Sequence, residues 1–515
     1  MSRVLSLPND TEMQIETAAY ALYKLYVVVF QPQFSSLRSL RGPASPSRIY
    51  GNLRQIFDTG SVRMQEMWVE QYGETIKYKG WLNQDYLYTV DPRAINHILT
   101  HSQDYHKPAL ARYMIAEAIG SVVVVEGEQH RKQNPAFGPV QLRNFTEIFV
   151  DRAIQLRNMW LDEISDDAQG ARLDVLNGLS KMTLDVMGSA GFDHEFDLLR
   201  RDGKFNELAD AFQAIFGPPS GKPLFLTVLQ FLLPPLRYLP TERTRRLAAA
   251  KATIYRIGAQ LLVEKKRILE ATVEGEKAGA MRLNFAGRDL LALLLKANMA
   301  TGIPVDQRLT DDEVLTPGYE TTANGAMWCL YALTQNLETQ EKLYAELSEV
   351  PTDGPSMDEL QALPFLDLVV RETLRLHAPV PSSLRVAVKD DTIPLQKPFV
   401  DVHGKPRDRI DVPKGTTIDI PLLALNRAKT IWGDDALEFN DLMTFLGGPR
   451  GCIGYRFAII EIKALILTLV RAFEFKLAIP ADEVVVKSTV VRRPIIRSET
   501  EKGTQMPMII RPRRA

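Results

Sequence analysis

The chain has 515 residues, of which 45% are hydrophobic and 24% charged, and its formal net charge at pH 7 is -1. These values are typical of a globular protein, and a nearly neutral chain gives no electrostatic argument for a nucleic-acid partner. Only two cysteines are present, Cys329 and Cys452, so no disulfide framework is expected. The composition predicts a large globular body that faces a reducing compartment.

The first 40 residues are set apart from the rest. Residues 17–30 (TAAYALYKLYVVVF) are apolar except for Lys24, but this run is shorter than the roughly 20 residues that span a bilayer. A buried or interfacial helix is one interpretation, and a weak membrane anchor is the one we favour. Residues 41–515 contain no Gly/Ser-rich or charged linker, so we expect one domain there.

Hydrophobic periodicity and turn residues predict the main elements of the body. Residues 144–270 show a helical pattern with few strand signals. The expected elements are a hairpin of 74–78 and 86–90, a helix from Pro92, a helix 184–196 that ends in a glycine turn, a helix 363–375, a hairpin 410–420 that turns at Lys414 and Gly415, and strands 484–491 and 508–510.

His97 and His101 have the i, i+4 spacing of a zinc pair on the helix from Pro92. No glutamate follows the first histidine and no third ligand is in register. Solvated or packed histidines are therefore the better interpretation.

Residues 445–454 (FLGGPRGCIG) place a cysteine in a glycine-rich loop before the apolar helical run 455–475. Glycines let a backbone turn tightly and approach a flat ligand. Cys452 lies just before the helix, whose free N–H groups and positive dipole end favour a thiolate, a soft ligand for iron. Arg450 offers a positive charge to a carboxylate on the same ligand. The alternative is a small buried cysteine in an ordinary loop.

The spacing F-x-x-G-x-R-x-C-x-G resembles the haem-binding loop of the cytochrome P-450 monooxygenases. It is filled here by Phe445, Gly448, Arg450, Cys452 and Gly454. In that family the cysteine thiolate is the axial iron ligand and pushes electron density toward O–O cleavage. The resemblance implies Cys452 as the metal ligand, haem b (iron protoporphyrin IX) as the cofactor, and the other four residues as its surroundings.

Two further segments resemble the same family. Gly318-x-Glu320-Thr321 is similar to the oxygen-activating part of the long central helix, where an acid beside a hydroxyl holds water and passes protons to dioxygen. A capping or surface role is the alternative. His130 and Arg131 resemble the pair that contacts a haem propionate, and a polar helix start on the surface is the other interpretation.

Glu372 and Arg375 are three residues apart and so share one face of the predicted helix. This E-x-x-R resembles the buried structural pair beneath the haem of the family, whereas a surface ion pair is the alternative. Arg385, in the segment Ser-Leu-Arg-Val-Ala, matches a position where the family often places a propionate-binding arginine.

The chain also departs from the family pattern. Residues that usually follow the His-Arg pair, precede Gly318, and lie between Phe439 and Phe445 are missing. The last gap removes a P-E-R-W-like stretch and with it the second arginine that normally joins the E-x-x-R pair. Pro317 stands where a small residue is usual, although proline inside a helix costs about 3 kcal/mol. These apparent internal deletions predict weak support for the cysteine loop.

The resemblance runs from about Arg41 onward and implies a mainly α fold with a small β-rich lobe, an α+β protein like fungal microsomal members. It implies a monooxygenase of secondary metabolism that inserts one oxygen atom from dioxygen into a lipophilic small molecule. NADPH-cytochrome P-450 reductase would supply electrons, with cytochrome b5 as a second donor. The implied location is the endoplasmic reticulum membrane, with the catalytic domain facing the cytosol and touching the membrane surface. A haem-thiolate isomerase or peroxygenase, and a catalytically impaired or non-catalytic relative, remain the alternatives.

Overall fold

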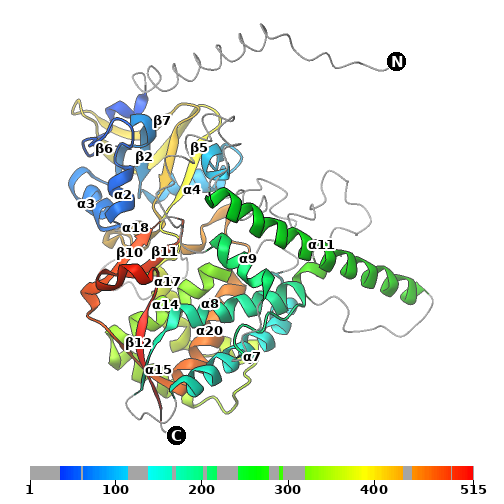
Figure 1. Ribbon diagram of the computed structural model, residues 1–515. Coiled ribbons are helices and arrows are strands. Elements are labelled where there is room, and N and C mark those ends of the chain that lie inside the picture. The colour runs from blue at the N-terminus through cyan, green and yellow to red at the C-terminus, as the bar shows by residue number, and fades with distance from the viewer. Residues whose placement is uncertain are drawn as a thin grey trace, which may run out of the picture. The chain divides into compact units, whose positions relative to one another are not determined.

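The structure is a computed structural model that describes residues 35–59, 62–113, 137–164, 170–200, 206–216, 242–277, 289–293, 319–432, 443–488 and 490–513. The chain packs as two compact units, one made of residues 1–106 and 383–421 and the other of residues 107–382 and 422–515 (Figure 1). The predicted single domain over 41–515 stays a prediction. Within the described ranges no helix has the length and apolar character to cross a bilayer, and the predicted anchor at 17–30 lies outside them.

The first unit is built on a five-stranded sheet in the order β1-β2-β8-β5-β3. Its strands are β1 (Thr75–Lys79), β2 (Asp85–Thr89), β3 (Tyr105–His106), β5 (Ser383–Ala387) and β8 (Thr417–Ile420), and a separate two-stranded sheet consists of β6 (Asp391–Val400) and β7 (Pro406–Val412). Antiparallel pairing of Thr75 with Thr89 confirms the first predicted hairpin.

Helices α2 (Leu53–Thr59), α3 (Val62–Tyr72) and α4 (Pro92–Thr100) complete this unit. Asp91 caps α4, because its carboxylate accepts the Ala94 N–H at 3.0 Å, as the Asp-Pro start predicts. His97 stacks on His101 with ring centroids 4.2 Å apart, and its Nε2 lies 2.9 Å from Asp391. The histidine pair is thus packed against a neighbouring carboxylate.

The predicted hairpin over 410–420 is wrong. Its two halves are strands, but β7 pairs with β6, whereas β8 lies between β2 and β5. After the turn, the Gly415 N–H donates to the Ala387 carbonyl at 2.8 Å, which directs the chain toward β5. Because β8 is a buried central strand, its partners come from distant parts of the sequence, and a local turn pattern does not reveal them.

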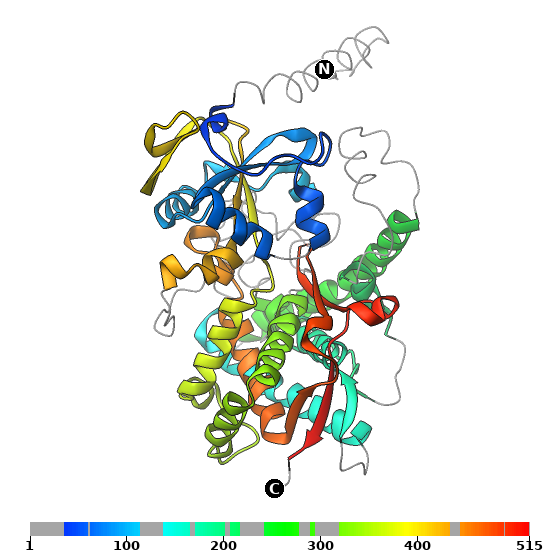
Figure 2. The same ribbon diagram turned by 90° about the vertical axis from the view of Figure 1, so that its left-hand side faces the viewer.

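The second unit is mainly helical. Its helices are α7 (Pro139–Ile164), α8 (Val175–Val186), α9 (Glu207–Phe216), α11 (Glu242–Lys277), α14 (Tyr319–Gln335), α15 (Leu337–Ser348), α16 (Met357–Gln361), α17 (Pro364–Leu376), α18 (Leu422–Arg427), α19 (Lys429–Trp432) and α20 (Tyr455–Ala472). Its strands are β4 (Ala171–Asp174), β9 (Phe473–Leu477), β10 (Val484–Ser488), β11 (Arg492–Ile496) and β12 (Pro507–Pro512). Strand β12 is the middle strand of the sheet β4-β12-β9, and Figure 2 shows it in red running toward the C-terminus.

The sequence predicts this unit correctly in outline, and three details differ. Strand β4 interrupts the helical region 144–270 and pairs with β12. Helix α8 continues as a π-helix, Met187–Phe192, which ends at Asp193 in the left-handed region (φ 53°) where a glycine was expected. Aspartate tolerates that conformation because its short polar side chain bonds locally. The run 455–475 begins as α20 and ends as strand β9.

Helix α20 is the centre of the second unit, because every residue from Ile459 to Val470 is buried. It contacts α7, α14, α15 and α17. Gly325 of α14 permits a close approach, since a Cβ there would lie 2.9 Å from Ile462 Cδ1. The helix that carries Glu320 and the helix that follows Cys452 are therefore held in direct contact.

Glu461 of α20 is 2% exposed, and its Oε1 has no hydrogen-bond partner in the described part of the chain. Burial raises the pKa of this carboxyl well above its ordinary value. The unfolded chain loses the proton near pH about 4.3 while the folded chain retains it, so stability falls as pH rises above that value.

We expect Glu461→Gln to reduce the loss of thermal stability between pH 5 and pH 8. The amide stays neutral in both states, so its protonation no longer depends on folding. Melting temperatures measured across this pH range test the effect. Glu349→Gln, at an exposed position, is the control and should leave the pH dependence unchanged. An identical pH dependence in Glu461→Gln would contradict this assignment.

Candidate functional site

The cysteine loop is closed by its own backbone. The Cys452 N–H donates to the Phe445 carbonyl at 2.7 Å, and the Gly451 N–H donates to Gly448 at 3.1 Å. Gly448 has φ 73°, a conformation that glycine adopts without strain. Gly454 is the N-cap of α20 and makes no side-chain cap, and its backbone N–H donates to the Cys452 sulfur. The predicted loop motif is therefore a defined turn that presents one thiol.

The Cys452 side chain is exposed on one side and surrounded by protein atoms on the others. This burial raises the pKa of the thiol, while the hydrogen bond from the Gly454 backbone N–H lowers it by a smaller amount. The expected thiolate is thus not produced by the helix start alone, because burial outweighs it. A metal ion bound to the sulfur removes the thiol proton outright.

Two arginines gather near the loop. Burial lowers the pKa of Arg450, and the nearby positive charge of Arg112 lowers it further. Like charges held together favour an anionic partner. An accessible sulfur, a backbone brought close by glycine and two cations fit haem, a flat ligand with two carboxylates. Arg112 was missed in the sequence because no motif surrounds it.

The E-x-x-R pair is formed as predicted on α17. Arg375 binds both carboxylate oxygens of Glu372, at 2.7 Å from Nε and 2.6 Å from a terminal nitrogen. The guanidinium also donates to the Asn426 carbonyl, at 2.5 Å, and lies 5.4 Å from the centre of the Trp432 ring. In the described ranges Arg375 is the one ion-pair partner of Glu372. The carbonyl and the indole contact the sides of Arg375 that Glu372 leaves open.

This pair is connected to the cysteine loop through two hydrogen bonds. Asn426 Nδ2 donates to Thr444 Oγ1 at 2.7 Å, and Thr444 Oγ1 donates to the Leu374 carbonyl at 2.7 Å. Thr444 directly precedes Phe445, so the start of the loop is fixed to the last turn of α17. The region between Phe439 and Phe445, where a segment was predicted to be missing, lies largely outside the described residues.

Glu320 is in the first turn of α14 and is bound by an arginine that was not predicted. Arg493 of β11 lies 2.6 Å from the carboxylate through Nε and 2.5 Å through a terminal nitrogen. Burial raises the pKa of Glu320, and Arg493 opposes this shift without cancelling it. The neighbouring Thr321 is exposed. The acid-hydroxyl pair is therefore present, with its acid held by a cation 173 positions away along the chain.

The remaining predicted haem contacts stay predictions. Arg385 belongs to the first unit, where it is 2% exposed and donates to Ser383 Oγ at 2.7 Å and to the Leu384 carbonyl at 2.8 Å. Burial lowers its pKa to about 10. His130, Arg131, Pro317 and Gly318 lie outside the described residues.

Comparison with known proteins agrees with this geometry. Residues 41–494 match the family described as Cytochrome P450. Cytochrome P450 monooxygenases 205 and 128 of Postia placenta are 51% and 46% identical, over 97% and 96% of both chains. Cytochrome P450 monooxygenase claU of Ampulloclitocybe clavipes is 33% identical over 93% of both chains.

The chain therefore belongs to the cytochrome P450 family. This confirms the predicted family, the mainly helical fold with small sheets, and the enzyme class, an oxidoreductase of the monooxygenase type. Family membership implies a haem-iron cofactor and a redox partner that delivers electrons.

The alignment with the first Postia placenta protein runs over 529 positions, more than the 515 residues of this chain. That relative consequently has residues for which this chain has no counterpart. This agrees with segments missing from the chain.

Thr444→Val is expected to lower both stability and haem retention. The substitution removes two hydrogen bonds, each worth about 0.5–1.5 kcal/mol, and frees the start of the cysteine loop. Haem content per chain and the melting temperature measure the effect. Thr334→Val of α14 is the control, because it removes a backbone bond of the same length to Tyr331 but lies outside the loop. Equal haem loss in both variants would contradict the proposed connection.

Proposed function

We propose that this chain is a haem b monooxygenase that inserts one oxygen atom into a lipophilic small molecule. The observation that carries the proposal is the accessible sulfur of Cys452, in a loop closed by the Cys452–Phe445 backbone bond. When bound, haem supplies the iron at which dioxygen is activated. Cys452 would hold the iron through its thiolate, and Arg450 with Arg112 would bind the propionates.

Glu320, Thr321 and Arg493 would deliver protons to the site where dioxygen is activated. A buried carboxylate held at 2.6 Å by a cation stays in one position, and it can exchange a proton with the hydroxyl of the next residue through water. Arg493 keeps more of the acid ionised than burial alone would allow. The pair favours a monooxygenase over a peroxygenase or isomerase, which need no such relay.

The partners and location follow from the sequence and stay part of the proposal. No flavin or dinucleotide fingerprint is present, so electrons would come from NADPH-cytochrome P450 reductase, with cytochrome b5 as a second donor. The apolar N-terminal segment favours attachment to the endoplasmic reticulum membrane, with the catalytic body on the cytosolic side. A substrate of secondary metabolism is what the resemblance to fungal microsomal members implies.

Phe212 of α9 is an aromatic residue of the protein core. It is 2% exposed and packs in a cluster with Phe196 and Ile254. It contributes to the body of the protein around α9 and α11. The proposal of a lipophilic substrate therefore rests on membership of the family and on the apolar sequence of residues 217–241, which lie outside the described ranges.

Cys452→Ser is expected to abolish the red-shifted Soret band of the reduced carbon monoxide complex, because serine supplies no thiolate to the iron. Cys329→Ala is the matched control. Cys329 is buried in α14, where burial raises its pKa to about 12, so it is not a candidate ligand. Retention of the band in Cys452→Ser would refute the proposal, and its absence from the unsubstituted chain would favour a non-catalytic relative.

Arg493→Gln is expected to uncouple electron use from product formation, and more strongly as pH falls. Without the cation the pKa of Glu320 rises further, so the acidic limb of the coupling profile moves to higher pH. Product and peroxide per NADPH, measured across pH with reductase, report the change. Lys487→Gln, on the paired position of the same hairpin, is the control. Thr321→Ala should uncouple at every pH, and an unchanged profile in Arg493→Gln would exclude this role.

A further inference from the structure

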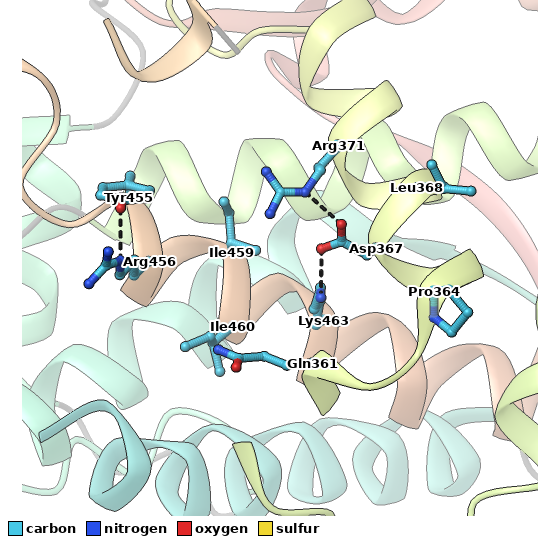
Figure 3. Close-up of a pocket in the computed structure, with 10 residues that line it drawn as sticks. All are labelled: Gln361, Pro364, Asp367, Leu368, Arg371, Tyr455, Arg456, Ile459, Ile460 and Lys463. Atoms are coloured by element: carbon cyan, nitrogen blue, oxygen red, sulfur yellow. Dashed lines mark hydrogen bonds and ion pairs between the residues drawn. The ribbon is translucent and has the colours of Figure 1, made fainter. Parts of the chain in front are cut away.

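A cavity of about 640 Å³ lies between α16, α17 and the start of α20 (Figure 3). It contains neither Cys452 nor Glu320 among its lining residues, so it is separate from the site described above. Its volume is within the roughly 300–1,000 Å³ of small-molecule sites. Charged groups gather in its middle and apolar side chains surround them.

The polar centre is built around one carboxylate. Asp367 accepts from the Lys463 ammonium at 2.7 Å and from Arg371 Nε at 2.6 Å. Burial raises the pKa of Asp367, and the interactions with Lys463 and Arg371 lower it by a larger total amount. The pKa of this carboxyl is therefore below its ordinary value. Two cations thus share a single anion, which leaves the centre with an excess positive charge.

The ammonium group of Lys463 has more hydrogen-bond donors than Asp367 uses. Its side chain is 3% exposed, and Asp367 is its one ion-pair partner in the described part of the chain. An ammonium group has three donors, and a buried donor without an acceptor costs about 1–3 kcal/mol. Arg371 turns its terminal nitrogens away from Asp367 and toward Ile459 (Figure 3). Both cations can therefore donate to a further acceptor in the cavity.

The rest of the lining is mainly apolar, with Gln361 and one more cation, Arg456. Leu368 and Tyr455 line the cavity and are 45% and 39% exposed, so both present apolar surface to solvent. Ile459 and Ile460 form a buried floor. Arg456 lies over the Tyr455 ring at 5.3 Å and donates to its hydroxyl at 2.8 Å. The occupant that matches this lining has an anionic head and an apolar body.

We propose that this cavity binds a small amphiphilic carboxylate, such as a medium-chain fatty acid. The carboxylate would take two parallel hydrogen bonds from the terminal nitrogens of Arg371, the geometry that guanidinium groups favour, and a third from Lys463. The chain of the ligand would cover Leu368, Ile459 and the Tyr455 ring. This inference does not depend on the proposed monooxygenase function, because no haem contact enters it.

Calorimetric titration of the full chain with decanoate, decanol and acetate tests the proposal. Decanoate should bind, decanol at least about tenfold more weakly because it lacks the charge, and acetate without detectable heat because it lacks the apolar body. Binding of decanol as tightly as decanoate, or no decanoate binding below about 1 mM, would overturn the proposal.

Two variants locate the binding. Arg371→Gln should weaken decanoate at least about tenfold, and Leu368→Trp, which fills the cavity from an exposed position, should abolish the heat. Arg172→Gln, which removes an arginine of β4 paired with Glu499, is the control and should bind normally. Unchanged affinity in the two cavity variants would place decanoate elsewhere, for instance at the haem, and refute the site. Loss of reductase affinity in Leu368→Trp without any decanoate binding would replace it with a protein-docking surface.

Discussion

The guanidinium of Arg375 is the contact on which the cysteine loop most depends. It joins Glu372 on its own helix, the Asn426 carbonyl of α18 and the Trp432 ring of α19. The charged guanidinium can be buried here because each of its sides has a partner. Removal of one partner from a buried charged group costs about 3–5 kcal/mol of stability. The same Asn426 holds Thr444, so the support of the loop and the burial of the charge are a single arrangement.

This arrangement reduces the expected effect of the segment that is missing between Phe439 and Phe445. In the resembling proteins a second arginine is expected beside the E-x-x-R pair, and the sequence offers none. Here a backbone carbonyl and an indole face satisfy Arg375 without adding another buried charge. Glu372 keeps a partly solvated side chain, 34% exposed, so water can compensate for the partner that it lacks. The loop is closed through hydrogen bonds and packing, with less reliance on ion pairs.

Elements defined by neighbouring residues were predictable from the sequence. The Asp91 cap, the first hairpin and helix α17 follow from signals within a few positions, and the structure contains each of them. The second hairpin failed because Lys414 and Gly415 do mark a turn, but pairing is decided by burial of β8 between β2 and β5. A turn signal identifies where a chain bends and says nothing of which strand it meets.

The site shows the same division. Cys452, Gly448 and Glu320 belong to short motifs, so sequence spacing alone identifies them as candidates. Arg493 and Arg112 have no motif, because they act through contacts with residues far along the chain. Their roles become visible only when a folded structure brings the two segments together.

The two cysteines also differ in a way that is useful for following the protein. Cys329 has no exposed surface, and its raised pKa makes it a poor nucleophile, whereas the Cys452 sulfur is open on one side. Alkylating reagents therefore have one accessible target, and iron coordination would shield that same atom. The extent of alkylation in a folded sample then counts the chains whose sulfur is not bound to a metal, so the protein carries its own chemical reporter of cofactor loading.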